Sequence, residues 1–387
     1  MRNCKKVYIL TYYYADNYGA VLQAYALAKY IRQVGFDPVF VKYIAQPPSL
    51  LSYLSSPRVL MRKIFSNYAG FLRKLRLNAS RLKTSHQSKY AEKFQDFRSR
   101  YLSVTEKSFT FDDLMEGSLV AHAFIVGSDQ VWSLDFVNGD RVYLLDFPTT
   151  GATKISYAAS FGKQKLEGFQ KPVFSKCLER FDYVSVREET GLNIVRGVGV
   201  DDAKCCLDPT LLNDNYDELL EDLPLRGRYI LFYQLSGDDS LVLEQRALVG
   251  QVAVELGLEV VSVMPGSTAP LNENFTLYAP APDEFVGLIR DAEFVITNSF
   301  HGMVFSTIFR KNFVVLPRDR FKDKQNLRMI EFLREYSLDY AYYSGLNSEK
   351  LKAIISKSHD FTCYLKKLSH NRTQSECYLA EALGIAQ

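Results

Sequence analysis

The chain has 387 residues, of which 47% are hydrophobic and 24% are charged. This composition is ordinary for a globular protein and excludes the disordered and collagen-like classes. The length favours two hydrophobic cores, and a formal net charge of +3 is too small to indicate nucleic acid, so we expect no nucleic-acid partner.

The cysteines and histidines give no sign of a metal or disulfide site. None of the six cysteines belongs to a Cys-x-x-Cys pair, and no histidine stands at zinc-ligand spacing. We therefore expect free thiols, no metal and no cofactor. The apolar run near the N-terminus is broken by Thr11 and Asp16 without a cleavage signal, and no stretch of about 18 apolar residues spans a bilayer. The expected location is the cytoplasm.

The chain opens with a strand, a helix and a second strand. Residues 7–13 (VYILTYY) are apolar and β-prone, residues 20–35 repeat apolar side chains at helical spacing, and residues 37–43 (DPVFVKY) are again β-prone. This order is typical of a βαβ unit and predicts a parallel α/β sheet. Further short apolar strands are predicted at 123–126, 154–160, 183–186, 229–235, 260–264, 293–297 and 313–317.

An acidic, proline-containing stretch at 208–228 separates two groups of predicted strands. We therefore predict two tandem Rossmann-like domains, 1–215 and 225–326, followed by a helical tail over 327–387. Doubly wound sheets bind ligands at the carboxyl ends of their strands. Residues that directly follow strands are therefore the candidates for function.

Two polar loops follow predicted strands of the first domain. In the motif ADNYGA, Asp16 or Asn17 can cap the next helix and Gly19 lets a ligand approach the backbone, although a cap and a tight turn alone explain the same residues. In the motif GSDQVW, Asp129 is placed as a general base for a hydroxyl nucleophile. A buried aspartate bonded to backbone amides is the alternative there.

Arg187 stands where a helix is predicted to begin, directly after the strand at 183–186. A cation is unfavourable at the positive end of a helix dipole unless an anion binds there. Arg187 is therefore a candidate clamp for a carboxylate or a phosphate. An ion pair with Glu188, Glu189 or another acid is the simpler alternative.

The stretch TNSFHGMVFS contains one of the five histidines. It follows the predicted strand at 293–297 and places His301 and Gly302 in the first turn of a predicted buried helix. The free amides and the dipole of such a helix start suit a phosphate. A histidine satisfied within the core is the alternative, but no carboxylate neighbours His301 in the sequence, which favours a functional role.

Taken together, these motifs resemble those of the polysaccharide pyruvyl transferase family. The matching pieces keep one order along the chain and are NYGAVLQAYAL (17–27), GSDQVW (127–132), YLLDF (143–147), KISYAASFG (154–162), SVREETG (185–191), LDPTLL (207–212) and TNSFHGMVFS (297–306). The resemblance implies a two-domain fold similar to type B glycosyltransferases. It also implies transfer of pyruvate from phosphoenolpyruvate to a sugar of a polysaccharide or lipid-linked glycan precursor, forming a ketal.

The resemblance implies that Arg187, His301 and Gly302 face phosphoenolpyruvate. The chain departs from the family at Ser299, where several members carry an arginine two residues before the histidine. Ser299 is kept as a donor-side residue, and a second anion clamp is expected from the segment at 316–329. Its candidates there are Arg318, Lys324 and Arg328. Without such a clamp, the donor is held more weakly or is a different molecule.

The reaction that the resemblance implies needs an acid and a base. We assign His301 as the acid or phosphate contact and Asp129 as the residue that faces the acceptor. The residues expected to line the sugar side are Asp16, Asn17 and Tyr18. Two other functions stay open: a glycosyltransferase that uses a nucleotide sugar on the same fold, and a non-catalytic glycan-binding member, which the missing arginine favours.

A basic segment at 58–100 lies within the predicted first domain. Over 58–77 its apolar residues recur at spacings of three and four, with Arg and Lys around the rest of the helix. Such a helix can bind an anionic membrane surface, where a lipid-linked sugar is found, or pack on its own domain with a solvated basic face. Peripheral membrane contact is therefore a secondary prediction.

Overall fold

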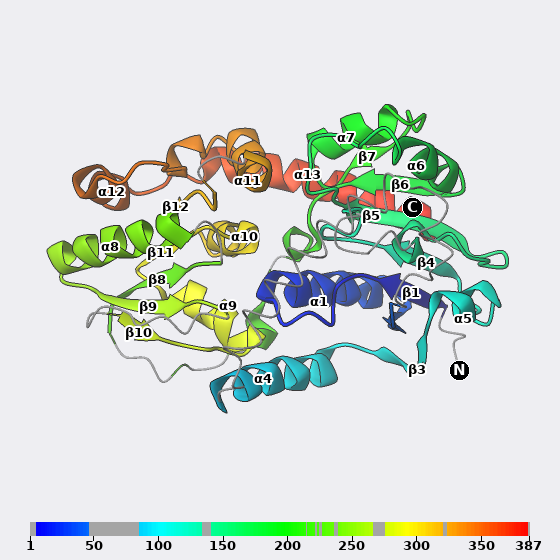
Figure 1. Ribbon diagram of the computed structural model, residues 1–387, viewed down its shortest axis with the longest axis horizontal. Helices are drawn as coiled ribbons and strands as arrows, with labels where there is room; N and C mark the ends of the chain where they lie inside the picture. Colours follow the sequence, from blue (N-terminus) through cyan, green and yellow to red (C-terminus); the bar gives the residue numbers. More distant parts are fainter. Residues whose placement is uncertain are drawn as a thin grey trace.

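The computed structural model describes residues 5–45, 85–133, 141–213, 215–220, 223, 227–235, 239–265, 275–319 and 323–385. Two parallel β-sheets lie side by side, each with helices packed against it (Figure 1). The predicted α/β class with two Rossmann-like halves is confirmed. The helix predicted at 58–77 lies outside the described residues.

The first sheet has seven strands in the order β3-β2-β1-β4-β5-β6-β7, and all adjacent pairs are parallel. Its central strands are short apolar runs, and every residue of β4 is buried, as expected for a parallel sheet covered on both faces. The strands are β1 (Lys6–Leu10), β2 (Asp37–Tyr43), β3 (Val104–Phe109), β4 (Ala123–Val126), β5 (Thr153–Ala159), β6 (Tyr183–Val186) and β7 (Lys204–Cys205).

The second sheet has five parallel strands in the order β10-β9-β8-β11-β12. The strands are β8 (Tyr229–Tyr233), β9 (Glu259–Val263), β10 (Phe275–Leu277), β11 (Phe294–Thr297) and β12 (Phe313–Val315). The strand order reverses between β8 and β11, as it does between β1 and β4 in the first sheet. Ligands bind at such switch points, so the loops after β1, β4 and β11 are the places to look for a site.

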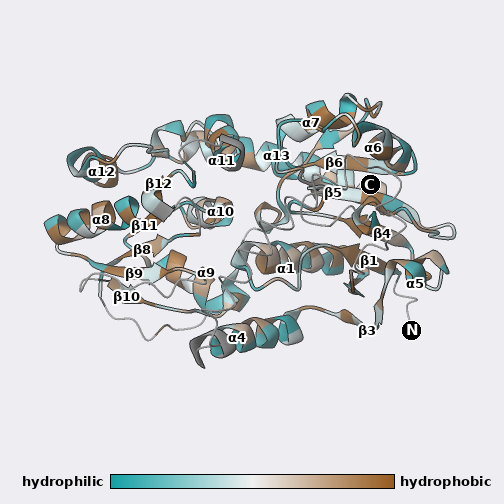
Figure 2. Ribbon diagram, viewed as in Figure 1, coloured by the Kyte–Doolittle hydropathy of each residue, from teal (hydrophilic) through white to brown (hydrophobic). Residues whose placement is uncertain are grey.

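The helices cover the sheets and join the two halves. They are α1 (Tyr18–Gln33), α4 (Ser85–Tyr101), α5 (Phe111–Met115), α6 (Lys171–Leu178), α7 (Glu189–Arg196), α8 (Asp239–Leu256), α9 (Pro282–Asp291), α10 (Phe300–Ile308), α11 (Asp323–Glu335), α12 (Ser348–Ile355) and α13 (Thr362–Ala382). The strands are mostly hydrophobic, whereas α4 is largely hydrophilic (Figure 2). Helix α1 is buried along most of its length because it packs against α9 and α10 of the second half.

The predicted helical tail divides between the two halves of the molecule. Helix α12 packs on α8 beside the second sheet, whereas α13 returns to the first sheet (Figure 1). There the Tyr378 hydroxyl donates to the Ser156 carbonyl at 2.8 Å, and the Leu207 amide donates to Ser375 Oγ at 3.0 Å. The tail therefore contacts both halves and connects them. The domain boundaries at 215, 225 and 327 stay a prediction.

The first strand is shorter than the sequence predicts. We expected residues 7–13, but β1 ends at Leu10. The Thr11 hydroxyl donates to the Ser128 carbonyl at 3.0 Å, so the chain leaves the sheet and turns toward the end of β4. This turn brings the loop before α1 to the switch point.

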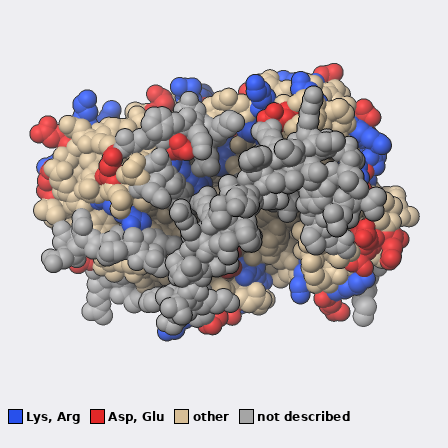
Figure 3. Space-filling model, in the orientation of Figure 1, with Lys and Arg blue, Asp and Glu red and all other residues tan. Residues whose placement is uncertain are grey.

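The described surface shows no block of charge of one sign in the view of Figure 3, where acidic and basic side chains are interspersed. Within the described ranges, no helix is long and apolar enough to cross a membrane.

Candidate functional site

A cavity of about 250 Å³ lies where the ends of β1, β4 and β11 meet between the two halves. Six residues that the sequence predicts for the site line it: Asn17, Asp129, Ser299, His301, Arg318 and Arg328. These residues come from four separate segments of the chain. The fold therefore brings predicted donor-side and acceptor-side residues around one small space.

Helix α10 positions His301 at this cavity. Ser299 caps the helix, since its Oγ accepts a hydrogen bond from the Gly302 amide at 3.4 Å. The Asn298 side chain accepts from the Leu235 amide at 2.7 Å and donates to the Leu235 carbonyl at 3.0 Å, which fixes the loop to the end of β8. The His301 side chain is only 8% exposed, so its ring orientation is set by its neighbours.

Asp208 is the main site residue that sequence reasoning missed. We expected no carboxylate beside His301, but Asp208 Oδ2 lies 3.3 Å from His301 Nε2. Thr210 fixes this carboxylate by donating to Oδ1 from its amide at 3.1 Å and from its hydroxyl at 2.7 Å. Burial by itself would raise the pKa of Asp208, but His301, Arg187 and Thr210 outweigh it and hold the pKa well below its ordinary value.

The motif that contains Asp208, LDPTLL, was visible in the sequence, and it suggests a capping aspartate before a turn. The partner His301 stands 93 residues further along the chain. Only the packing of the two halves makes this contact, so no local pattern indicates it.

Arg187 is held in a network of carboxylates. Its Nε lies 3.1 Å from Glu188, its Nη1 lies 2.8 Å from Asp208, and its Nη2 lies 3.9 Å from Asp129. The alternative that the sequence left open, an ion pair with Glu188 or another acid, is therefore present. The side chain is only 2% exposed, and its Nη2 has no hydrogen-bond partner among the described residues. Arg187 and His301 share Asp208, but Arg187 lines a neighbouring, larger cavity.

Asp129 projects from a left-handed turn at the end of β4. Its φ is +69°, a conformation that is uncommon outside glycine but tolerated by aspartate. Its carbonyl accepts from the amides of Val131 and Ser160 at 2.8 and 2.9 Å, which fixes the turn. The side chain keeps 20% exposure and lines the small cavity. Backbone strain of this kind is concentrated at functional sites.

Two arginines from the segment at 316–329, Arg318 and Arg328, line the same cavity. Burial, and then repulsion by Arg187, lower the pKa of Arg328 to about 10, and burial also lowers the pKa of Arg318. Within the described part of the chain, Arg328 Nε has no hydrogen-bond partner. Such a poorly compensated cation is favourable for an anionic ligand. The Lys324 side chain lies outside the described residues.

The residues expected on the sugar side have different environments. Asn17 caps α1 through its Oδ1, which accepts from the Ala20 amide at 3.1 Å, and it lines the small cavity. Asp16 forms an ion pair with Arg98 of α4 at 2.9 Å. Tyr18 is fully buried, and its hydroxyl donates to the Pro280 carbonyl at 2.8 Å. Tyr18 therefore joins the two halves and offers no surface to a sugar in this structure.

Tyr18→Phe should lower the free energy of unfolding by about 1 kcal/mol, because the Pro280 carbonyl loses its partner. The KM for a sugar acceptor should not change. Urea unfolding followed by fluorescence measures the first quantity, and steady-state kinetics measures the second. Tyr14→Phe, at a side chain 51% exposed, is the control and should alter neither. A raised acceptor KM in Tyr18→Phe would restore Tyr18 to the sugar site.

Two glycines allow close packing at the site. A Cβ on Gly19 would lie 2.0 Å from His301 Nδ1, so the start of α1 presses directly on the ring. A Cβ on Gly302 would lie 2.6 Å from Thr297 Oγ1. Gly302 is thus required for packing α10 on its sheet, while its predicted contact with the donor stays a prediction.

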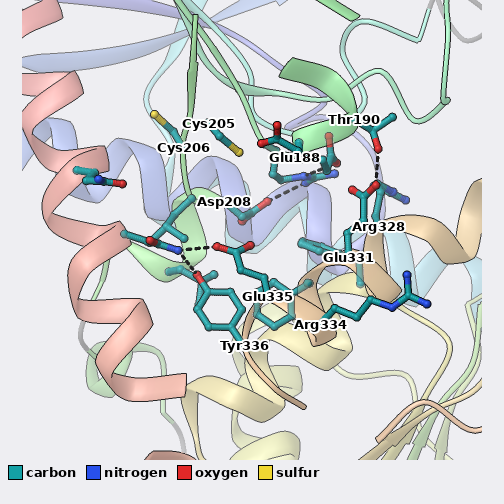
Figure 4. A pocket seen from close by; sticks show the side chains of 18 of the residues that line it. Glu188, Thr190, Cys205, Cys206, Asp208, Arg328, Glu331, Arg334, Glu335 and Tyr336 are labelled. Carbon is teal, nitrogen blue, oxygen red and sulfur yellow. Dashed lines mark hydrogen bonds and ion pairs between the residues drawn. The ribbon is translucent and has the colours of Figure 1, made fainter. Parts of the chain in front are cut away.

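The larger cavity has a volume of about 570 Å³ and lies between α7 and α11 (Figure 4). Phe300 and Arg328 line both cavities, so the two share a wall. Glu188, Glu331 and Glu335 also line the larger cavity. The sequence did not indicate the two glutamates of α11, because charged residues on a helix usually face solvent. Across the described ranges, no group of three metal-ligating side chains could hold an ion.

The fold is similar to those of solved structures. The S. aureus MnaA–UDP co-structure gives a TM-score of 0.53 at 10% identity, covering 99% of this chain and 98% of that one. The UDP-GlcNAc 2-epimerase of Methanocaldococcus jannaschii gives a TM-score of 0.52 at 10% identity, covering 94% of this chain and 99% of that one. At this identity the likeness concerns the fold alone, which confirms the predicted similarity to type B glycosyltransferases.

No curated protein matches the sequence. One protein family does: its sequence model, described as Polysaccharide pyruvyl transferase, matches residues 17–320 and therefore most of the chain. The match includes the loops that carry Asn17, Asp129, Arg187 and His301. The chain thus belongs to the polysaccharide pyruvyl transferase family and is a glycan-modifying transferase.

Proposed function

We propose that this transferase moves pyruvate from phosphoenolpyruvate to a sugar hydroxyl pair of a polysaccharide or lipid-linked glycan precursor, forming a ketal in the cytoplasm. The observation that carries the proposal is the grouping of Arg318 and Arg328 with His301 and Asp129 around one cavity of about 250 Å³. A donor with two anionic groups needs two cations, and a protonation step needs an acid beside them.

The arginines account for the donor despite the serine at position 299. In the proposed complex, Arg318 and Arg328 bind the carboxylate and phosphate of phosphoenolpyruvate. Both guanidinium groups have a lowered pKa because burial disfavours their charge. An anion that binds in the cavity offsets the cost of burying these two charges. The guanidinium groups are already in position, so binding does not have to order them.

The proposed reaction begins with a proton from His301 to the methylene carbon of phosphoenolpyruvate. The central carbon becomes cationic, and a sugar hydroxyl adds to it while Asp129 accepts the hydroxyl proton. The bond to phosphate then breaks, and a second hydroxyl closes the ketal. One of the two hydroxyl protons replaces the proton given to the methylene carbon, and the other leaves with phosphate.

The test is an assay of phosphate release. Purified protein is incubated with phosphoenolpyruvate and a panel of galactosides and mannosamine-type sugars, and products are analysed by mass spectrometry. We expect release of inorganic phosphate only when an acceptor is present, together with a pyruvylated sugar. Absence of both with every acceptor would contradict the proposal.

A nucleotide-sugar glycosyltransferase is the second candidate, because the similar solved structures were determined with UDP or UDP-GlcNAc. The same assay with UDP-sugars in place of phosphoenolpyruvate separates the two. Release of UDP with transfer of the sugar would favour this alternative. Binding of glycans without turnover of either donor would favour a non-catalytic member.

Arg328→Gln should raise the KM for phosphoenolpyruvate about 10-fold to 100-fold, because a hydrogen bond to a charged group is lost. The melting temperature should stay the same or rise, since the charged form of Arg328 is already disfavoured by burial and Arg187. Initial-rate kinetics and a thermal melt measure the two effects. Arg228→Gln, which breaks a surface pair with Glu293, is the control. An unchanged KM in Arg328→Gln would remove Arg328 from the donor site.

A further inference from the structure

The larger cavity has the chemistry of a binding site rather than of a packing defect. Its volume of about 570 Å³ falls within the range of cavities that bind drug-sized ligands. It is walled by the start of α7, the segment after β7, and helices α11 and α13. The labelled residues in Figure 4 reach it from opposite sides, with Glu188 on one wall and Glu331 and Glu335 on the other.

Besides Arg328 Nε, which also borders the small cavity, two buried polar atoms on its wall lack hydrogen-bond partners within the described ranges. One is the donor Arg187 Nη2, on a side chain only 2% exposed. The other is the acceptor Glu331 Oε2, whose second oxygen accepts from the Thr190 hydroxyl. Buried polar groups are rarely left unpaired. A ligand that both accepts and donates hydrogen bonds satisfies both atoms, and a sugar hydroxyl does so.

The charge of the lining excludes a strongly anionic ligand. The carboxylates of Glu188, Glu189, Glu331 and Glu335, with that of Asp208, outnumber the guanidinium groups of the cavity wall. Burial raises the pKa of Glu331 and of Glu335, which is the direction expected for carboxylates without sufficient cationic partners. A pyrophosphate would be repelled here, whereas a neutral or amine-bearing sugar would not.

The position of the cavity fits an acceptor site. Phe300 and Arg328 form the wall shared with the small cavity. Arg187, on the larger side, lies 3.9 Å from the proposed base Asp129. Asp208 lines the larger cavity and contacts His301, which lines the smaller one. The two cavities are therefore separated by the thickness of a side chain.

We propose that the cavity between α7, α11 and α13 is the acceptor subsite, and that it binds an uncharged or amine-bearing sugar through Glu331 and Arg187. This inference rests on the proposed pyruvyl transfer. It replaces the loop at Asp16 and Tyr18 as the main sugar contact, because those side chains form an ion pair and a buried contact between the halves.

Glu331→Gln tests the subsite because it keeps the shape of the side chain and removes its charge. We expect the KM for a methyl galactoside acceptor to rise about tenfold or more, as for other hydrogen bonds to charged groups. The Kd for phosphoenolpyruvate in the absence of acceptor, measured by calorimetry, should stay within about twofold of the wild-type value. The matched control is Glu255→Gln, at a helix glutamate paired with Lys352.

Gln374→Trp is the second variant, since Gln374 is an exposed residue of α13 at the cavity rim and its replacement does not put folding at risk. It should also raise the acceptor KM without altering phosphoenolpyruvate binding.

A methyl galacturonoside should compete more weakly than the neutral galactoside. Failure of wild-type protein to bind phosphoenolpyruvate would contradict the proposed function. Normal donor binding and transfer, with an unchanged acceptor KM in both variants, would overturn the subsite alone.

Discussion

Asp208→Asn should lower kcat for pyruvyl transfer by about 10²-fold to 10⁴-fold, the range seen when a carboxylate that orients a histidine is neutralised. In the wild-type protein one oxygen of Asp208 contacts both His301 Nε2 at 3.3 Å and Arg187 Nη1 at 2.8 Å. An asparagine side chain is uncharged, so it cannot replace the carboxylate that holds both His301 and Arg187. The histidine therefore loses its fixed orientation. The KM for phosphoenolpyruvate should change much less, because Arg318 and Arg328 are the proposed contacts of the donor.

The same substitution should lower the free energy of unfolding by about 3 to 5 kcal/mol, because it leaves buried cations undercompensated. The pKa of Asp208 is depressed, so its stabilising contribution is present above the unfolded value of about 3.9 and is lost only as pH falls through the lower folded value. The full loss should therefore appear at neutral pH. Urea unfolding at pH 7 measures it.

Asp146→Asn is the control that separates the effect of Asp208 on the orientation of His301 from its effect on stability. Asp146 is also a buried carboxylate held by two arginines, Arg141 at 2.6 Å and Arg180 at 2.7 Å, and it lines neither of the two cavities. This control should lose stability but keep its kcat at temperatures where it is folded. An Asp208→Asn protein that is folded and retains wild-type kcat would show that the carboxylate does not orient the histidine.

The central strands and the buried edge strand β12 were predictable from the sequence, whereas the other edge strands were not. Strands β4 and β11 are buried on both faces and therefore form short continuous apolar runs. Strand β3, with the sequence VTEKSF, lies at the edge of its sheet and is half exposed, so its residues do not form such a run. Strand β10 has only three residues at the other sheet's edge. Edge strands that are partly exposed, such as these two, bury too little apolar surface to leave a clear pattern.

The site was predictable where its residues directly follow strands. Asp129 and His301 were identified in this way, because the carboxyl ends of parallel strands meet at the switch points of the fold. Asp208 and Glu331 were not, since their roles depend on contacts made across the two halves. The segment at 316–329 was expected to replace the missing arginine, but the cavity that Arg318 and Arg328 share is a result of tertiary packing.

Gly19→Ala should reduce kcat about 100-fold, because the new methyl group would lie 2.0 Å from His301 Nδ1 and 2.6 Å from its Cγ. The ring must move, and a misplacement of about 1 Å costs roughly that factor in rate. In a helix, alanine is more favourable than glycine by about 1 kcal/mol. Overpacking costs about 1 to 3 kcal/mol, so the net change in the free energy of unfolding should be a modest loss. Kinetics and urea unfolding measure both quantities.

The double variant Gly19→Ala with His301→Ala decides whether the clash is the cause. Removing the ring makes room for the methyl group, so the double variant should be more stable than the His301→Ala protein, by the helix propensity of alanine, while remaining inactive. Gly168→Ala, with no atom within 4 Å of the new Cβ, is the control and should keep full activity. If Gly19→Ala retains wild-type kcat, then α1 does not fix the histidine, and the orientation of His301 depends on Asp208 alone.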